Sequence, residues 1–114
     1  MSTPAQVPRN VIGFLRAHVD HVVKLRFVVL LHRSAGVTTS VQVAARALEV
    51  PRSQVRDMAN ELACDGLVRI SGDTLELVPP SIDDRLAIAD LASWYTQDRA
   101  PILELLRELG RIAS

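Results

Sequence analysis

The first third of the chain has a pattern of apolar residues that predicts two successive helices. The first is expected to begin at Asn10, a suitable N-cap residue, and the second at Asp20. Apolar residues crowd almost every face of the second helix up to Leu31, which predicts that this helix lies at the centre of the core. Residues 34–36 end it, because Gly36 suits the left-handed turn that follows many helices.

Two shorter helical stripes follow between residues 39 and 64. Thr39 and Gln42 fit a capping box, which predicts a helix that starts near Ser40. Pro51 separates the stripes, because proline can begin a helix but cannot continue one. The pattern therefore predicts two short helices joined by a tight turn that Val50 fills. Their apolar stripes are Val41, Ala44, Ala45 and Leu48, then Val55, Met58, Ala59 and Leu62.

After Gly66 the hydrophobic period changes from that of a helix to that of a strand. Residues 67–70 are extended, residues 71–73 form a turn, and residues 74–78 alternate polar with apolar side chains, which predicts a hairpin. From Ile82 the helical pattern returns, breaks between Gln97 and Pro101, and resumes as far as Ile112. The predicted fold class is mainly α with a small β-hairpin, that is, α+β.

The order of these elements resembles that of bacterial winged helix-turn-helix transcriptional regulators. The resemblance covers about residues 20–79, through TSVQVAARALEVPRSQVRDMANELACDGLVRI and the hairpin after it. A looser likeness, to small bacterial winged-helix proteins with an added C-terminal helix, rests on FLRAHVDHVVKLRFVVLLHR and DLASWYTQDRAPILELL. We therefore expect a flexible arm over residues 1–9, a winged helix-turn-helix domain over 10–80 and a helical tail over 81–114.

The resemblance implies that the helix over residues 52–64 enters the major groove of DNA while the hairpin touches the flanking backbone. Arginine, glutamine and asparagine can read base edges with two hydrogen bonds each. The residues expected to meet the groove are Arg52, Ser53, Gln54, Arg56 and Asn60. Those expected to contact the DNA backbone are Thr39, Ser40, Arg46, Arg69 and Ser71. The expected function is a transcriptional regulator that binds double-stranded DNA.

The charge pattern leaves a second function open. The net charge is zero, but residues 1–56 hold eight basic and two acidic side chains, whereas residues 57–114 hold five basic and eleven acidic ones. Asp57, Glu61 and Asp65 form a row along the expected reading helix, and carboxylates that face phosphates are repelled. The alternative is a protein–protein interaction adaptor that keeps the winged-helix fold without sequence-specific DNA binding.

The C-terminal tail carries an apolar stripe that must be buried, either on the body of the chain or on a second copy. We expect a homodimer, since symmetric dimers are the commonest outcome for such stripes. Trp94 and Tyr95 are large side chains of the kind enriched at interfaces, and they could equally fill the junction between tail and domain. The expected interface residues are Trp94, Tyr95, Ile102, Leu105, Leu106 and Leu109.

Other chemistry finds little support. Cys64 is the only cysteine, and His18 and His21 lack an evident third ligand, so neither a metal site nor another cofactor is expected. No phosphate-binding glycine loop or nucleophile elbow occurs, so we do not expect an enzyme. The chain has no apolar run of membrane-spanning length and no signal core, which predicts a cytoplasmic protein. The sequence does not specify the DNA target, any effector, or whether the protein activates or represses.

Overall fold

The fold is mainly helical with a small antiparallel sheet, so the expected α+β class is confirmed. A computed structural model describes residues 7–34 and 38–110. Residues 1–6 of the expected arm over 1–9, the turn residues Ala35 and Gly36, and the end of the tail lie outside the described residues, while Arg9 already belongs to the first helix. The elements are α1 (Arg9–His18), α2 (Val22–Arg33), β1 (Thr39–Ser40), α3 (Val41–Leu48), α4 (Arg52–Cys64), β2 (Val68–Ser71), β3 (Thr74–Leu77), α5 (Ile82–Gln97) and α6 (Ala100–Glu108).

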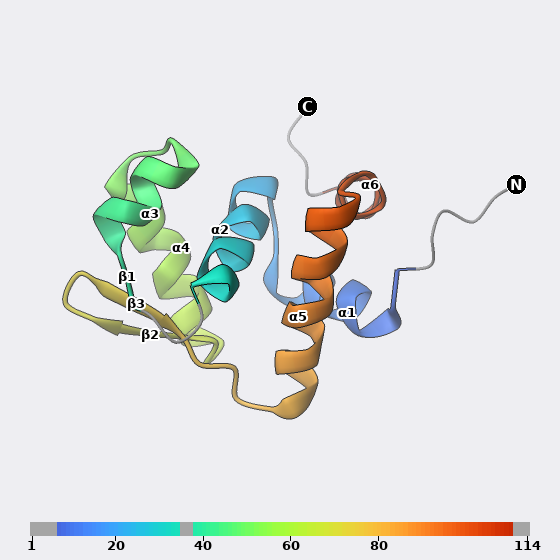
Figure 1. The fold of residues 1–114 in the computed structure, drawn as a ribbon, viewed down its shortest axis with the longest axis horizontal. Helices are drawn as coiled ribbons and strands as arrows, with labels where there is room; N and C mark the ends of the chain where they lie inside the picture. The colour runs from blue at the N-terminus through green and yellow to red at the C-terminus, as the bar shows by residue number, and fades with distance from the viewer. Residues whose placement is uncertain (1–6, 35–37, 111–114) are drawn as a thin grey trace, which may run out of the picture.

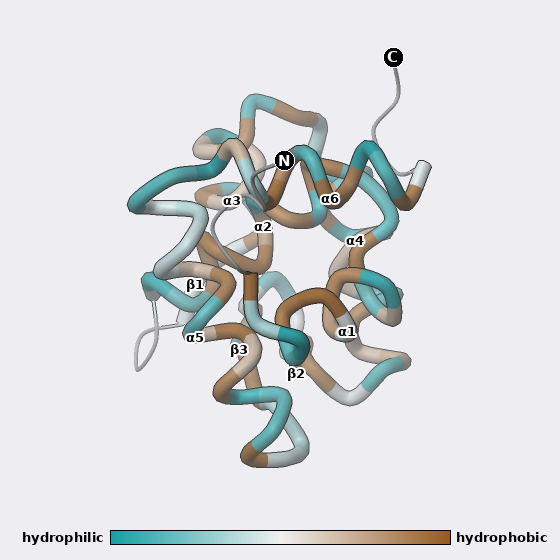
Figure 2. Tube along the Cα trace, turned by 90° about the vertical axis from the view of Figure 1, so that its right-hand side faces the viewer, coloured by the Kyte–Doolittle hydropathy of each residue, from teal (hydrophilic) through white to brown (hydrophobic). Residues whose placement is uncertain are grey.

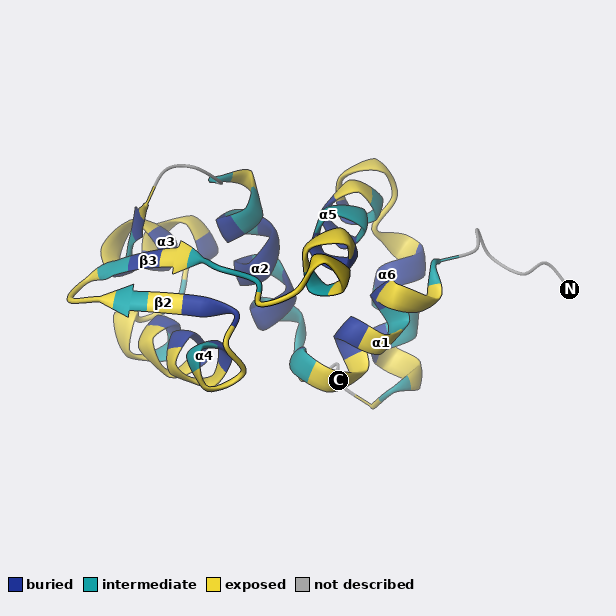
Figure 3. Cartoon of the chain, turned by 90° about the horizontal axis from the view of Figure 1, so that it is seen from below, coloured by how far each residue is buried: buried dark blue, intermediate teal, exposed yellow. Residues whose placement is uncertain are grey.

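Helix α2 lies in the middle of the molecule. The helices α3 and α4 and the sheet lie on one side of it, and α1, α5 and α6 lie on the other (Figure 1). Phe27 and Leu25 are fully buried, as the apolar character of this segment predicted. Figure 3 shows these buried turns of α2 between the two groups of elements. Helix α1, expected as part of a domain over residues 10–80, packs mainly against α5 of the tail.

Three helices begin one or two residues away from their expected caps. Helix α1 starts after Pro8, and the Asn10 side chain instead donates to Oδ2 of Asp90 on α5 at 3.1 Å. The cap of α2 is His21 rather than Asp20, because the His21 Nδ1 accepts from the Lys24 amide. In α2 two adjacent polar residues, Asp20 and His21, can both serve as the cap, so residue type alone does not choose between them. The first turn of α1 has no side-chain cap.

The cap of α3 is Ser40 rather than Thr39, so the expected capping box is wrong. The Ser40 hydroxyl accepts from the Val43 amide at 3.0 Å. Moving the cap by one residue puts Val43, not Gln42, at the third helical position, where a glutamine would be needed to complete the box. Thr39 belongs to strand β1 instead.

The sheet has three strands in the order β1-β3-β2, all antiparallel. The expected hairpin is confirmed, with Ser71 opposite Thr74 and Gly72 at φ +62° in the two-residue turn between them, a position that favours glycine. Strand β1 was not predicted from the sequence. It has only two residues, Thr39 and Ser40, which is too short for an alternating pattern to appear.

The turn between α3 and α4 is tight, as expected. Glu49 adopts the left-handed conformation with φ 58° and ψ 46°, and the Val50 amide donates to the Ala45 carbonyl at 3.1 Å. Val50 is half-buried against the core, which agrees with its expected role in filling the angle between the helices. This turn fixes where α4 leaves α3 and therefore which side of α4 faces outwards.

The tail breaks where the sequence predicted, since α5 ends at Gln97 and α6 begins at Ala100. The trace of α6 alternates between hydrophilic and hydrophobic residues, as expected of an amphipathic helix (Figure 2). Ile102 and Leu106 are fully buried within the chain itself, and Tyr95 is nearly so. Of the expected dimer residues, Ile102 and Leu106 are therefore wrongly assigned, because side chains fully covered by their own chain cannot contact a second copy, whereas Tyr95 keeps 8% of its surface. Trp94, Leu105 and Leu109 are half-buried.

Candidate nucleic-acid interface

One side of α4 is buried and the other faces outwards, as its pattern predicted. Val55, Met58, Ala59 and Leu62 form the buried side. Arg52, Ser53, Arg56 and Asn60 are exposed, and Gln54 is half-buried. The outer side of α4 over residues 52–60 thus presents two guanidinium groups and an amide to solvent on one rigid element. These are side chains that can pair with base edges or phosphates.

The acidic row of α4 is largely engaged with the body of the molecule. The Lys24 ammonium of α2 lies 2.8 Å from Oε1 of Glu61. The His18 Nδ1 of α1 lies 2.8 Å from Oδ2 of Asp65. These two contacts hold the C-terminal half of α4 against the preceding helices, so two of the three carboxylates already have partners. Asp57 is exposed and has no ion-pair partner within the described part of the chain.

The hairpin supplies carboxylates to two of the candidate arginines. Arg56 forms an ion pair with Asp73 in the hairpin turn, and Nη1 of Arg69 lies 3.3 Å from Oε1 of Glu76 on the opposite strand. All four side chains are about half exposed or more, and exposed ion pairs contribute only about 0–1 kcal/mol. Such weak pairs can exchange one partner for another without a large loss of stability.

Asp73 also links the hairpin to α3. Its backbone carbonyl accepts from the Val41 amide at 2.8 Å, while its side chain pairs with Arg56. The start of α3, the middle of α4 and the hairpin turn are therefore joined at a single residue. This arrangement fixes the position of the hairpin relative to the exposed side of α4.

The candidate backbone contacts differ in how accessible they are. Arg46, Arg69 and Ser71 are exposed, and Arg46 lies with Arg52 around a shallow hollow at the turn between α3 and α4. The Ser40 hydroxyl is occupied as the helix cap. Thr39 retains only 6% of its surface, so it is removed from the set of expected DNA contacts, because a buried side chain cannot reach a duplex.

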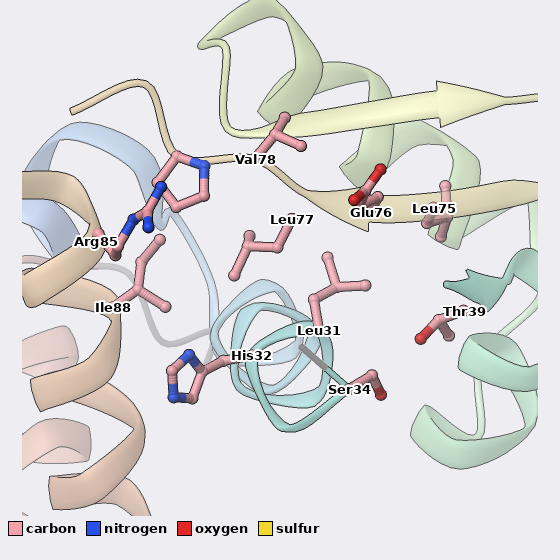
Figure 4. A pocket seen from close by; sticks show the side chains of 11 residues that line it. Leu31, His32, Ser34, Thr39, Leu75, Glu76, Leu77, Val78, Arg85 and Ile88 are labelled. Atoms are coloured by element: carbon pink, nitrogen blue, oxygen red, sulfur yellow. The ribbon is translucent and has the colours of Figure 1, made fainter. Parts of the chain in front are cut away.

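Thr39 instead lines a cavity of about 500 Å³ between α2, β3 and the start of α5. Figure 4 shows Thr39 at one end, Arg85 and His32 at the other, and Leu31 and Leu77 between them. The cavity is therefore apolar in its middle and polar at its ends. It belongs to the junction between the two groups of elements and does not include the exposed side of α4.

No protein-family model, curated protein or solved structure matches the chain. Function is therefore inferred from the geometry and charges of the site alone.

The described residues offer no group of three or more histidine, cysteine, aspartate or glutamate side chains that could hold a metal ion. His18 and His21 are instead engaged with Asp65 and with the start of α2. None of the described helices is both long and apolar enough to cross a membrane.

Sequence reasoning missed the role of Lys24. Its side chain is only 6% exposed, and its ammonium pairs with the carboxylate of Glu61. The available signal was the position of a lysine inside an almost wholly apolar helix, since a lysine in such a place needs a carboxylate partner from another element.

Proposed function

We propose that this protein has a winged helix-turn-helix fold and binds double-stranded DNA through α4. The observation that carries the proposal is the contrast between the outer side of α4 and its C-terminal end. Over residues 52–60 the helix exposes Arg52, Arg56 and Asn60, while Glu61 and the C-cap residue Asp65 are paired with the body. The order helix, short strand, helix, helix and hairpin over α2–β3 supports the same fold.

In this proposal the outer side of α4 over residues 52–60 enters the major groove, where such helices contact base edges. Asn60 suits adenine, whereas Arg52 and Arg56 suit guanine or the phosphates. Arg56 and Arg69 exchange Asp73 and Glu76 for phosphate oxygens. This exchange costs little free energy because both ion pairs are exposed and therefore weak. Gln54 and Ser53 take supporting positions on the same turn, and Arg46 and Ser71 contact the backbone.

The proposal includes a homodimer that regulates transcription. Dimeric proteins of this class bind two half-sites related by symmetry, which increases affinity and selectivity. Trp94, Leu105 and Leu109 are the members of the expected interface that keep surface for a second copy. Sedimentation velocity of the protein with and without its selected duplex measures this directly, and a monomer in both conditions would contradict the dimer.

The function is tested by selecting bound duplexes from a random library and measuring affinity by fluorescence anisotropy over a range of salt concentrations. The double variant Arg52→Ala with Arg56→Ala should weaken binding. It should also lower the slope of log affinity against log salt by about one for each arginine that touches a phosphate. The matched control is Arg16→Ala on α1, because Arg16 is exposed and has no ion-pair partner among the described residues. Unchanged binding in the double variant would disprove the assignment to α4.

The alternative function is a protein-interaction adaptor with the same fold. It is favoured by the two ion pairs at the hairpin, because these leave Arg56 and Arg69 neutralised in the free protein. The same selection separates the two functions. An adaptor enriches no duplex and shows no anisotropy change even at low salt, where non-specific binding to phosphates is strongest.

A further inference from the structure

A second group of arginines lies around a cavity between α2, α3 and the junction of α5 with α6. The cavity has a volume of about 310 Å³, and Arg26, Arg33 and Arg99 all line it. The other described residues that line it are apolar side chains and Tyr95, so the described lining contains no carboxylate. Three arginines therefore line one cavity, and no acidic side chain of the described lining balances their charge.

Two of these guanidinium groups are held in place by neutral partners. Nη2 of Arg33 donates to Oγ1 of Thr96 at 2.7 Å. The guanidinium carbon of Arg99 lies 4.9 Å from the centre of the Tyr95 ring, a cation–π contact. Neither partner carries a negative charge. These arginines thus differ from Arg56 and Arg69, whose charges are compensated by carboxylates.

The positions of the arginines on the helices explain why they converge. Arg26 and Arg33 are seven residues apart on α2, which places them on the same side of that helix two turns apart. Arg99 comes from the break between α5 and α6, so it reaches the same hollow from another element. Bringing like charges together costs free energy unless an anion binds between them.

Tyr95 adds a neutral hydrogen-bond donor to the three guanidinium groups. It is only 8% exposed and lines the same cavity. Its hydroxyl has no hydrogen-bond partner among the described residues. Every fully enclosed polar side-chain atom among those residues has a hydrogen-bond partner. Because the Tyr95 hydroxyl has none, it must be accessible and must account for part of the 8% of Tyr95 that is exposed. It can therefore donate to an acceptor oxygen of a bound anion.

We propose that this cavity binds a small phosphorylated molecule. Arginine is the residue best suited to phosphate, because its planar group donates two parallel hydrogen bonds to phosphate oxygens. The volume is near the lower end of the range for small-molecule sites, roughly 300–1,000 Å³, which fits a compact anion. The site is separate from the exposed side of α4 and does not depend on DNA binding.

The test titrates inorganic pyrophosphate into the full chain by isothermal calorimetry at constant ionic strength. We expect saturable binding at one site per chain. Arg26→Gln and Arg99→Gln should each weaken it roughly tenfold or more, since each removes a charge-assisted hydrogen bond. Tyr95→Phe keeps the ring beneath Arg99 and should weaken binding several-fold. Arg52→Gln is the matched control and should bind as the wild type does.

Melting curves establish whether each variant is folded. A variant that does not fold is replaced by Arg33→Gln, which should leave the fold intact because Arg33 is exposed. Three results would overturn the proposal. The first is pyrophosphate binding that does not saturate, the second is an Arg26→Gln variant that binds pyrophosphate as tightly as the wild type does, and the third is an Arg52→Gln variant whose binding is weakened as much as that of Arg26→Gln. Duplex affinity is measured on the same proteins. If Arg26→Gln weakens duplex binding as much as Arg52→Gln does, the cavity contacts nucleic acid phosphates and the small-molecule proposal is wrong.

Discussion

Lys24 is a buried cation of α2 that pairs with a carboxylate of α4. Its stem is buried among apolar residues of α2, while its ammonium lies 2.8 Å from Glu61 and 3.7 Å from Asp20. A buried ammonium is stable only when a carboxylate compensates for its lost hydration. The side chain of Glu61 therefore points towards α2, and its charge is paired with Lys24 although it remains about half exposed.

Two adjacent hydroxyl residues, Thr39 and Ser40, have different roles that a stability measurement can separate. Ser40→Ala removes the acceptor for the Val43 amide and should lower the free energy of unfolding by about 1 kcal/mol. Thr39→Val keeps the shape of a buried side chain and suits a strand, so it should leave stability within about 0.5 kcal/mol or raise it. Urea unfolding measures both.

Thr39→Val also tests the corrected site assignment. Duplex affinity should not change in this variant, because Thr39 faces a cavity rather than the exposed side of α4. Weaker duplex binding at unchanged stability would restore Thr39 as a DNA contact.

At the scale of elements, hydrophobic period predicted the helices and the hairpin well. The stripe of Val55, Met58, Ala59 and Leu62 is the buried side of α4, and the break before Pro101 is present. Caps were predicted less accurately, since Thr39 and Ser40 are equally able to cap α3 by type alone. Pairing with Leu75 draws Thr39 into β1 and leaves the cap to Ser40. That pairing links residues far apart in sequence, so no local pattern reveals it.

The contact between the hairpin and α4 gives a prediction at this scale. Asp73→Asn removes a carboxylate beside the proposed groove-facing side and frees Arg56, while the backbone bond to Val41 remains. We therefore expect duplex affinity to rise several-fold at low salt and the salt dependence to steepen. The matched control is Asp83→Asn in the first turn of α5, which removes the same charge away from α4. Lower affinity in Asp73→Asn would mean that the pair with Arg56 orients the arginine for binding.

At the scale of the whole molecule, the tail contributes to the core of its own chain. Helix α5 packs against both α1 and α2, and Ile102 and Leu106 of α6 are completely covered. A short helix pair with a hairpin has little core of its own, so these helices provide the apolar surface that it lacks. The same arrangement creates the junction in which Arg26, Arg33 and Arg99 meet.

The burial of α6 predicts how truncations of its leucines affect stability. Leu106→Ala should lower the free energy of unfolding by about 2–4 kcal/mol, because it leaves a cavity in a covered site. Leu105→Ala should cost less, since Leu105 is half-buried. Urea unfolding at two protein concentrations measures both effects. If Leu106→Ala left the monomer stable and only dissociated a dimer, α6 would be an interface helix after all.

The sequence by itself determined the helices, the hairpin and the apolar side of each, because hydrophobic period is a local property. Strand β1 depended on pairing with β3. The sequence also placed Asp57, Glu61 and Asp65 in one row on α4. Only the tertiary structure decided which side chains lie next to that acidic row, and that Arg26, Arg33 and Arg99 line one cavity. Lys24 and His18 lie far from α4 in sequence, and Arg99 lies far from Arg26, so their contacts arise when helices pack. Charge partners are set by that packing because Coulomb interactions depend on distance in space, not along the chain.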